Sequence, residues 1–253
     1  MRIYCDAYEL MSEMGRNLWE MGLENRPKRY QNKDISQDEN FITKELICEQ
    51  YCLTSLPDPD LLFIHTKSKD WAEAEFTERV DPNMVNPGRA WELRKEIWEE
   101  FLNDRNKFDY SYGERMNQRC ISTYGKPGFQ TALEVVIETL KFDPDTRKAI
   151  LPIYSDGDTA FLDGKARIPC SMYYDFLIRT NAKGEKQLNI CYHQRSSDFV
   201  CHFGNDVWLA WKLMEYVAEQ VGVKPGYLYH TIDSLHVYKR DWDVLKTSLT
   251  ELK

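Results

Sequence analysis

The sequence lacks several features that would place it in a broad class. No stretch approaches the roughly 20 apolar residues of a membrane span. The N-terminus carries Asp6, Glu9 and Glu13, where a signal peptide would need an unbroken apolar run. Internal repeats and low-complexity linkers are also missing. We therefore expect a single catalytic or binding domain over residues 1–253, located in the cytoplasm and without a membrane partner.

An excess of basic charge is missing as well, because the net charge is −8. Binding to a nucleic-acid duplex depends on Lys and Arg contacts that release counterions, so duplex nucleic acid is not an expected partner. One small anion in a local basic pocket remains compatible with this charge. A single nucleotide is therefore a possible ligand.

The seven cysteines form no regular pattern. Their odd number and irregular spacing do not fit a disulfide framework. Cys48 and Cys52 are four residues apart and would share one face of a helix, but no second close pair of Cys or His completes a metal site. We interpret them as buried structural thiols and expect no metal.

What the sequence has is a high share of apolar and aromatic residues, 42% and 13%. Helical spacing of apolar residues recurs in five segments. A strand end or turn is expected at Gly113. The expected helices are 7–23, 70–79, 90–102, 130–140 and 205–221, and the expected strands are 148–155, 170–179, 187–193 and 227–232. Because helices and strands interleave without a strict βαβ order, we expect an α+β (α/β) fold with a mixed sheet and packed helices.

Two clusters carry a nucleophile and a cation. Cys170 follows Pro169 at an expected strand start, and a thiolate attacks electron-poor double bonds, although a strand cysteine also serves in a core. In QRSSD, Arg195 is flanked by hydroxyls that suit a phosphate; the alternative is a surface pair between Arg195 and Asp198.

Three further clusters lie beside a turn, on a strand and at a helix start. Residues 143–148 place two cations beside a turn. His236 and Tyr238 alternate on a strand and so share a face, either to hold a sugar hydroxyl or as a core pair. Asp206 precedes a long helix, where an N-cap is the simplest interpretation.

Taken in order, these clusters resemble the thymidylate synthase superfamily, and within it the phage deoxycytidylate hydroxymethylases. The matching segments are CSMYYDFLIR, RSSD, HFGND and SLHVY, with PDTRK, Ile97-Trp98 and Tyr112-Gly113 upstream. The resemblance is strong over 91–240 and thin before that. It implies a homodimer with shared active sites and, for a phage protein, the host cytoplasm as location.

The resemblance also implies a reaction on a pyrimidine nucleoside monophosphate. The cysteine adds to C6, and C5 then takes a one-carbon unit from 5,10-methylenetetrahydrofolate. A synthase reduces the product with hydride, whereas a hydroxymethylase adds water. The chain ends soon after Tyr238 without a synthase-like apolar tail, which favours water.

Residue roles follow from the same resemblance. Cys170 matches the nucleophile, and Arg195 is placed to lower its pKa and to bind phosphate together with Ser196. Asp198 matches the residue that contacts the folate ring. The remaining matches are His236 and Tyr238 for the 3′-hydroxyl, and Arg147 and Lys148 for phosphate across the dimer interface.

Asp206 stands where synthases carry Asn. An amide complements the O4 acceptor and N3–H donor of uracil, whereas a carboxyl group accepts from N4 of cytosine and shares a proton with N3. Asp206 therefore favours cytosine. Ser171, where synthases usually have His, points to the hydroxymethylase branch.

Three assignments are less specific. The family general acid/base maps to Glu73, with Glu75 as the alternative, and Tyr112 matches the tyrosine that assists proton removal at C5. Arg26 and Arg29 in the early basic loop are both candidates for phosphate.

The leading hypothesis is a deoxycytidylate 5-hydroxymethyltransferase. The alternatives are a dCMP C5-methyltransferase, a CMP hydroxymethylase, a thymidylate synthase and a non-enzymatic nucleotide- or RNA-binding homologue. The joint presence of Cys170, Arg195 and Asp206 argues against the last.

Overall fold

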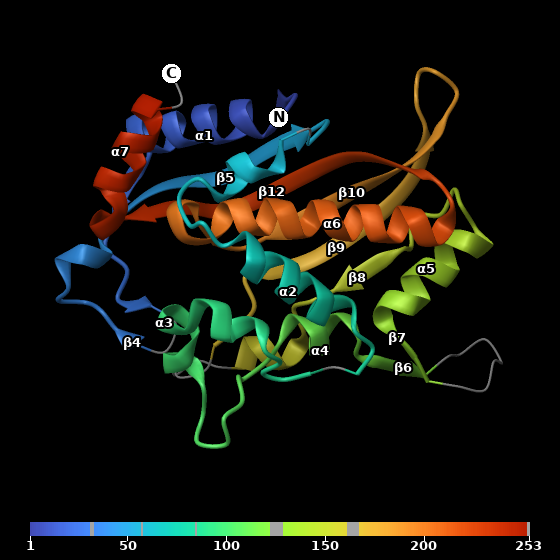
Figure 1. The fold of residues 1–253 in the computed structure, drawn as a ribbon, viewed down its shortest axis with the longest axis horizontal. Helices are drawn as coiled ribbons and strands as arrows, with labels where there is room; N and C mark the ends of the chain where they lie inside the picture. Colours follow the sequence, from blue (N-terminus) through green and yellow to red (C-terminus); the bar gives the residue numbers. More distant parts are fainter. Residues whose placement is uncertain (31–32, 57, 84, 122–128, 161–166, 252–253) are drawn as a thin grey trace.

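The fold is built on a mixed eight-stranded sheet (Figure 1). Its strands are β1 (Arg2–Tyr4), β2 (Leu23–Asn25), β5 (Thr43–Leu53), β8 (Ile150–Pro152), β9 (Ser171–Thr180), β10 (Lys186–Gln194), β11 (Ser197–Asp198) and β12 (Lys224–Tyr238). They run in the order β1-β5-β12-β10-β9-β8, with β2 beside β5 and β11 beside β12. The computed structural model describes residues 1–253 apart from 31–32, 57, 84, 122–128, 161–166 and 252–253.

Parallel and antiparallel pairs are combined in this sheet. β1 is parallel to β5, and β10 and β11 are parallel to β12, while β5, β9 and β8 join antiparallel neighbours. The register aligns Tyr174, Tyr192, His230 and Tyr51 in one row across four strands, and all four are buried. Since side chains alternate between the faces of a strand, this row belongs to the covered face of the sheet.

Helices cover that face. They are α1 (Ala7–Met21), α2 (Lys69–Val80), α3 (Lys95–Trp98), α4 (Tyr112–Met116), α5 (Ala132–Phe142), α6 (Gly204–Val221) and α7 (Trp242–Glu251). In Figure 1, α6 crosses in front of the sheet, and it packs against β12, β10 and α2. Its large buried side chains, such as Trp208 and Met214, each contribute about 1.5–3 kcal/mol of burial free energy.

Short elements complete the chain. In the part of the chain that the structure describes, the short helical turns are η1 (Glu39–Phe41), η2 (Pro59–Phe63), η3 (Ala90–Arg94), η4 (Glu99–Phe101), η5 (Asp156–Ala160), the π-helical η6 (Phe199–Phe203) and η7 (Lys239–Asp241). Among the described residues, β3 (Arg29–Tyr30) pairs with β4 (Lys33–Asp34), and β6 (Arg119–Ile121) pairs with β7 (Phe129–Thr131), each as a separate two-stranded sheet.

The expected mixed sheet with packed helices is confirmed, and the expected strands 170–179 and 187–193 correspond to β9 and β10, which pair antiparallel. Three local expectations were wrong. Cys48 and Cys52 lie on the strand β5, and Cys48 is exposed. The expected helix 90–102 is divided into η3, α3 and η4, with Leu93 exposed.

The third error is the expected strand end or turn at Gly113, where the chain forms the helix α4. A capping box starts this helix: Ser111 Oγ accepts from the N–H of Glu114 at 3.1 Å, and Glu114 Oε2 accepts from the N–H of Ser111 at 2.9 Å. Such reciprocal bonds satisfy two free amide groups of a helix start.

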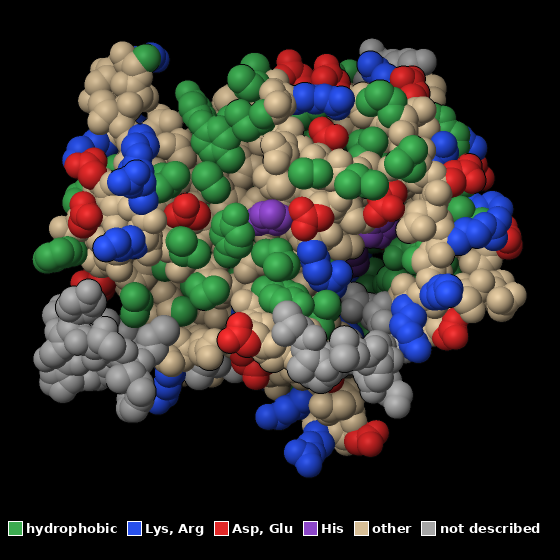
Figure 2. All heavy atoms as spheres, turned by 180° about the vertical axis from the view of Figure 1, so that it is seen from behind, with side chains coloured by type: hydrophobic (Ala, Val, Ile, Leu, Met, Phe, Trp, Pro, Cys, Tyr) green, Lys and Arg blue, Asp and Glu red, His purple; other side chains and the backbone are tan. Residues whose placement is uncertain are grey.

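The opposite face of the sheet is more open. Figure 2 views the molecule from behind and shows hydrophobic side chains exposed on this side. Ile150, Tyr173 and Tyr227 are 47%, 38% and 36% exposed. Among the helices that the structure describes, none has the length and hydrophobicity to cross a membrane.

Candidate active site

A cavity of about 440 Å³ lies where β9, β10 and β12 meet α2, α4 and the segment from η3 to η4. Many residues that the sequence singled out line it, among them Cys170, Arg195, Ser196, Asp198, Asp206, His236, Tyr238 and Tyr112. The structure therefore brings together residues that are spread over more than half of the chain.

Cys170 lies just before β9 and is half-buried at the cavity wall. The backbone N–H of Arg195 donates to its carbonyl oxygen at 2.8 Å. The Arg195 guanidinium donates to the carbonyl oxygens of Pro169 at 2.8 Å and Ile168 at 3.0 Å, and its Nη2 lies 3.9 Å from the Cys170 sulfur. Arg195 thus fixes the segment that carries the thiol.

The electrostatic effect on Cys170 differs from the sequence expectation. Burial raises the pKa of the Cys170 thiol, and this effect outweighs the opposing cations Arg195 and Arg167, while the nearby Asp206 adds to the rise. Arg195 does favour the thiolate, but the net direction is upward because removal from water disfavours the charged form. A bound ligand or a proton acceptor is needed to draw the proton away.

Asp206 lies in the first turn of α6 and faces the cavity. Gln194 Nε2 donates to its Oδ2 at 2.7 Å, and Ser197 Oγ donates to the same oxygen at 2.9 Å. Among the described residues, Oδ1 has no hydrogen-bond partner. Burial raises the pKa of Asp206 to about 6, and the bonds from Gln194 and Ser197 oppose that rise.

The N-cap interpretation of Asp206 is wrong. Phe203 occupies the cap position of α6 and makes no side-chain cap bond. Gly204 allows the start of α6 to pack closely against the backbone of η2, because a Cβ at this position would lie 1.8 Å from the carbonyl oxygen of Leu62. Asp206 is therefore free to bond side chains of the sheet rather than the amides of its own helix.

His236 and Tyr238 share a face of β12, as their alternation predicts, and both line the cavity. Their rings meet edge to face with centroids 5.0 Å apart. Both side chains are largely buried, yet each borders the cavity, so the sugar-binding and core interpretations do not exclude each other. Ser196 borders the same space.

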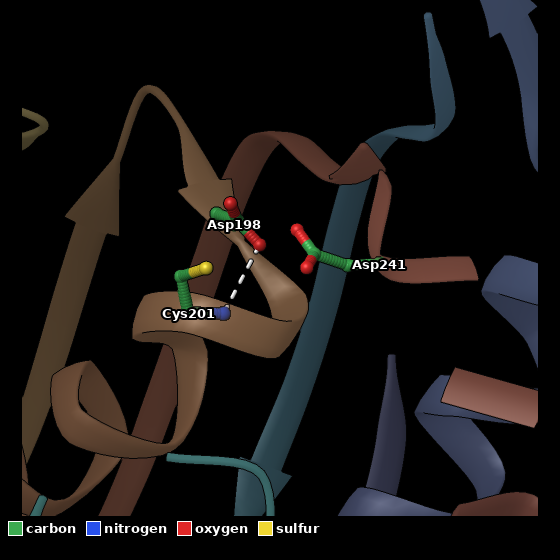
Figure 3. Close-up of side chains that lie close together, drawn as sticks. All are labelled: Asp198, Cys201 and Asp241. Carbon is green, nitrogen blue, oxygen red and sulfur yellow. Dashed lines mark hydrogen bonds between the residues drawn. The ribbon is translucent and has the colours of Figure 1, made fainter. Parts of the chain in front are cut away.

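Asp198 serves as the N-cap of η6, because its Oδ1 accepts from the N–H groups of Val200 and Cys201 at 3.1 Å each. Asp241 points toward it in Figure 3, and ligand atoms of Asp198, Cys201 and Asp241 lie within 4.8 Å of one another. Burial raises the pKa of Cys201 strongly, so this thiol is neutral, and the Asp198 oxygen Oδ1 is already occupied by the two backbone amides. We interpret the cluster as a helix cap beside the Asp241–Arg240 ion pair.

The general acid/base assignment to Glu73 is corrected by its position. Glu73 lies on the exposed side of α2 and does not line the cavity, whereas Glu75 does. Two residues that are two apart on a helix point in nearly opposite directions, so only one of them can face the site. Glu75 accepts at 2.8 Å from Nε of the buried Arg79, whose guanidinium lies 4.1 Å from the ring centre of Tyr112.

Tyr112 is held beside the nucleophile segment. Ser171, the residue after Cys170, donates to the Tyr112 hydroxyl from both its backbone nitrogen and its Oγ, at 3.4 Å each. The Ser171 hydroxyl also lies 2.6 Å from that of Tyr192. Burial raises the pKa of Tyr112 well above its usual value, so this phenol is neutral.

Three predicted phosphate ligands lie outside the cavity. Arg26 forms an exposed ion pair with Glu39 at 2.6 Å, and the cavity is lined instead by Arg29, the alternative from the same loop. Arg147 and Lys148 are exposed between α5 and β8.

Sequence reasoning missed the aromatic wall of the cavity. Trp91, Ile97, Trp98 and Phe101 lie on the segment expected as the helix 90–102, and they border the cavity together with Phe108 and Tyr110. Arg167 also lines it, and its guanidinium lies 4.4 Å from the Phe101 ring centre. Its position three residues before Cys170 was the available signal.

Comparisons with known proteins agree with this arrangement. A family model described as thymidylate synthase matches residues 89–253. A protein named "Putative thymidylate synthase" from Methanosarcina mazei is 31% identical over 177 residues, which are 69% of this chain and 73% of the relative. The "Deoxyuridylate hydroxymethyltransferase" of Bacillus phage SP01 is 32% identical over 147 residues, or 56% of this chain and 37% of that protein.

The fold has a solved counterpart. Thermostable thymidylate synthase A from Bacillus subtilis superposes with a TM-score of 0.72 and 18% identity, over 97% of this chain and 84% of that chain. The expected thymidylate synthase-like fold is confirmed.

Proposed function

Because the chain belongs to the thymidylate synthase family, whose members are folate-dependent one-carbon transferases, we propose that it converts dCMP to 5-hydroxymethyl-dCMP. The one-carbon unit comes from 5,10-methylenetetrahydrofolate, and water supplies the new hydroxyl group. The other product is tetrahydrofolate.

One observation carries the choice of base: both side-chain donors bound to Asp206 use Oδ2. Oδ1 then remains as the oxygen that meets the ligand, and a carboxylate oxygen only accepts hydrogen bonds. The N4 amino group of cytosine supplies a donor, whereas O4 of uracil would face it with a lone pair. With a pKa of about 6, Asp206 is mainly ionised at neutral pH, which is the form that accepts from N4.

In this proposal the Cys170 sulfur bonds to C6, and C5 gains the one-carbon unit and then loses its proton. Glu75 and Tyr112 line the cavity on the side of α2 and α4 and are the groups that we assign to this proton transfer. Loss of tetrahydrofolate with that proton leaves an exocyclic methylene on C5. Water then adds to the methylene carbon, and departure of the Cys170 sulfur from C6 restores the ring double bond. Arg195, Ser196 and Arg29 are assigned to the phosphate, and His236 and Tyr238 to the 3′-hydroxyl.

The lining of the cavity suits a folate as co-substrate, which supplies a carbon at the oxidation level of formaldehyde. Trp91, Trp98 and Phe101 present flat apolar faces to a ring system. Trp98 Nε1 and Arg167 Nε are buried donors without a partner among the described residues, and buried donors are normally satisfied. These residues and Asp198 are the ones we assign to the folate.

Addition of water rather than hydride is supported by two observations. Ser171 follows the nucleophile, as in the hydroxymethylase branch. The similar protein of phage SP01 carries a hydroxymethyltransferase name. Because that name specifies deoxyuridylate, hydroxymethylation of dUMP is the second candidate.

We also propose that the active protein is a homodimer, formed through the open face of the sheet. The exposed Ile150, Tyr173 and Tyr227 on that face support it. Arg147 and Lys148, which lie outside their own cavity, would then bind phosphate in the partner's site.

The test is one set of incubations. The protein is mixed with methylenetetrahydrofolate and dCMP, dUMP or CMP, and the nucleotide and folate products are identified by mass. We expect a product with one added hydroxymethyl group from dCMP, and tetrahydrofolate. Turnover of dUMP alone would contradict the base assignment, and dihydrofolate would contradict the addition of water.

A further inference from the structure

A chain of three hydrogen bonds connects Asp206 to a strand that does not border the cavity. Tyr51 OH lies 2.8 Å from His230 Nδ1, and His230 Nε2 lies 3.1 Å from Gln194 Oε1. Gln194 Nε2 then donates to Asp206 Oδ2 at 2.7 Å. Tyr51, His230 and Gln194 are at most 1% exposed, so water does not compete for these bonds.

The direction of each bond in this chain follows from the one before it. Gln194 directs its amino group to a carboxyl oxygen, so its Oε1 accepts from His230 and requires a proton on Nε2. Burial lowers the pKa of His230 to about 3, which leaves the ring neutral with a single N–H. Its Nδ1 therefore accepts, and the Tyr51 hydroxyl is the donor.

Packing holds the central ring of the chain in place. The His230 ring stacks on Tyr192 with centroids 4.3 Å apart, and Tyr192 stacks on Tyr174 at 4.4 Å. The ring therefore has little freedom to turn, and only its tautomer remains to be chosen. The Tyr51 hydroxyl makes that choice.

We infer that Tyr51 is a positioning residue for base recognition, which acts through His230 and Gln194 to keep Asp206 Oδ2 supplied with a donor and Oδ1 free for the base. We call Tyr51, His230 and Gln194 the relay. This role concerns the same site as the proposed function, and its relevance to catalysis rests on that proposed function.

Loss of the Tyr51 hydroxyl would leave the tautomer of His230 unspecified. Without Tyr51 OH, His230 can carry its proton on Nδ1, and Nε2 then accepts from a reversed Gln194 amide. The Gln194 oxygen would face Asp206, which favours a protonated carboxyl because a carboxylate would be repelled. The relay thus stabilises the ionised form of Asp206.

Other groups also act on Asp206 and remain unchanged in the test. Ser197 donates to it, and Arg79 and Arg94 lower its pKa from α2 and η3. The remaining titratable groups that interact with it electrostatically come from several elements: Cys170, Tyr112, Tyr174 and Tyr192. A variant at Tyr51 leaves all of them in place.

The experiment uses Tyr51→Phe, with Tyr4→Phe as the matched control. Tyr4 is also buried, and its ring centre lies 5.9 Å from that of Tyr51, but it is not part of the relay. The carboxyl carbon of Asp206 is followed by NMR in the unliganded, aspartate-labelled full-length protein, and Asp206→Asn identifies its signal. We expect Tyr51→Phe to raise the pKa of Asp206 by about one unit, the worth of one net hydrogen bond.

A double-mutant cycle separates the relay from general packing. Gln194→Met should raise the pKa of Asp206 by itself, and Tyr51→Phe should add nothing in that background. Equal effects of Tyr51→Phe and Tyr4→Phe, or full additivity with Gln194→Met, would overturn the inference.

Nucleotide binding supplies the functional readout. An ionised carboxyl group accepts from N4 of cytosine, whereas a protonated one can donate to O4 of uracil. A rise of one unit in the pKa of Asp206 should therefore lower the ratio of dUMP to dCMP dissociation constants about tenfold in Tyr51→Phe, and the ratio should stay constant in Tyr4→Phe. An unchanged ratio in Tyr51→Phe would overturn the role in base recognition. The pKa of Asp206 is measured without a nucleotide, so a wild-type preference for dUMP would reject the proposed function while the relay is still tested.

Discussion

Ser197 Oγ donates a 2.9 Å hydrogen bond to Oδ2 of Asp206, which joins the short strand β11 to the first turn of α6. Gln194 donates to the same oxygen. Two donors on one oxygen fix how any residue at position 206 can orient, because an acceptor has to face them.

This constraint predicts the outcome of Asp206→Asn. The amide oxygen should take the place of Oδ2, which turns the amide nitrogen toward the cavity as a donor. That donor complements O4 of uracil, so kcat/KM for dUMP relative to dCMP should rise by roughly 100-fold. Steady-state kinetics with both nucleotides measure the ratio, and an unaltered base preference would refute the base-reading argument.

The same variant has an expected effect on stability. Burial raises the pKa of Asp206 to about 6, so its contribution to the free energy of unfolding is full below about pH 4 and is lost as pH rises through 6. Asn carries no charge at any pH. Relative to the wild type, Asp206→Asn should therefore gain up to roughly 3 kcal/mol between pH 4 and pH 8.

Urea unfolding at several pH values measures this difference. A gap between the two proteins that does not change with pH would mean that the carboxyl group is not desolvated in the folded state.

The sequence was most informative where local pattern and chemistry coincide. The alternation of His236 and Tyr238 correctly predicts that they share a face. The QRSSD motif predicted a site cluster, and Arg195, Ser196 and Asp198 all border the cavity. Such predictions succeed because neighbours in sequence are held together by one strand.

Positions that depend on tertiary packing could not be predicted in this way. Helical spacing places Glu73 and Glu75 on opposite sides of α2, but it does not show which side faces the sheet. The aromatic wall around Trp98 has the composition of a core, and only the arrangement of η3, α3 and η4 makes it a cavity lining. The strand β5 was missed because Cys48 and Cys52 at a spacing of four also fit a helix.

The two glutamates of α2 offer a matched pair for catalysis. Glu75→Gln keeps an acceptor for Arg79 but cannot take a proton, so kcat should fall by roughly 100-fold or more. Glu73→Gln, on the exposed side of the same helix, should retain wild-type kcat. A lower kcat for Glu73→Gln than for Glu75→Gln would contradict the assignment of Glu75 to proton transfer.

The early loop offers a second matched pair. Arg29 borders the cavity, whereas Arg26 is paired with Glu39 at the surface. Arg29→Ala should raise the KM for the nucleotide about tenfold, which is the typical effect of losing one charge-assisted bond, and Arg26→Ala should leave it unchanged. Equal KM values for the two variants would show that Arg29 does not bind the phosphate.

The most direct test of the account is to trap the bond between Cys170 and the base. Fluorine at C5 of dCMP cannot leave as the proton does, so 5-fluoro-dCMP and methylenetetrahydrofolate should arrest the reaction at the covalent adduct. Tryptic mass spectrometry should find that adduct on residues 168–179, faster than with 5-fluoro-dUMP, and Cys170→Ser should abolish it. An adduct on another cysteine, or one formed only with the uracil analogue, would contradict the account.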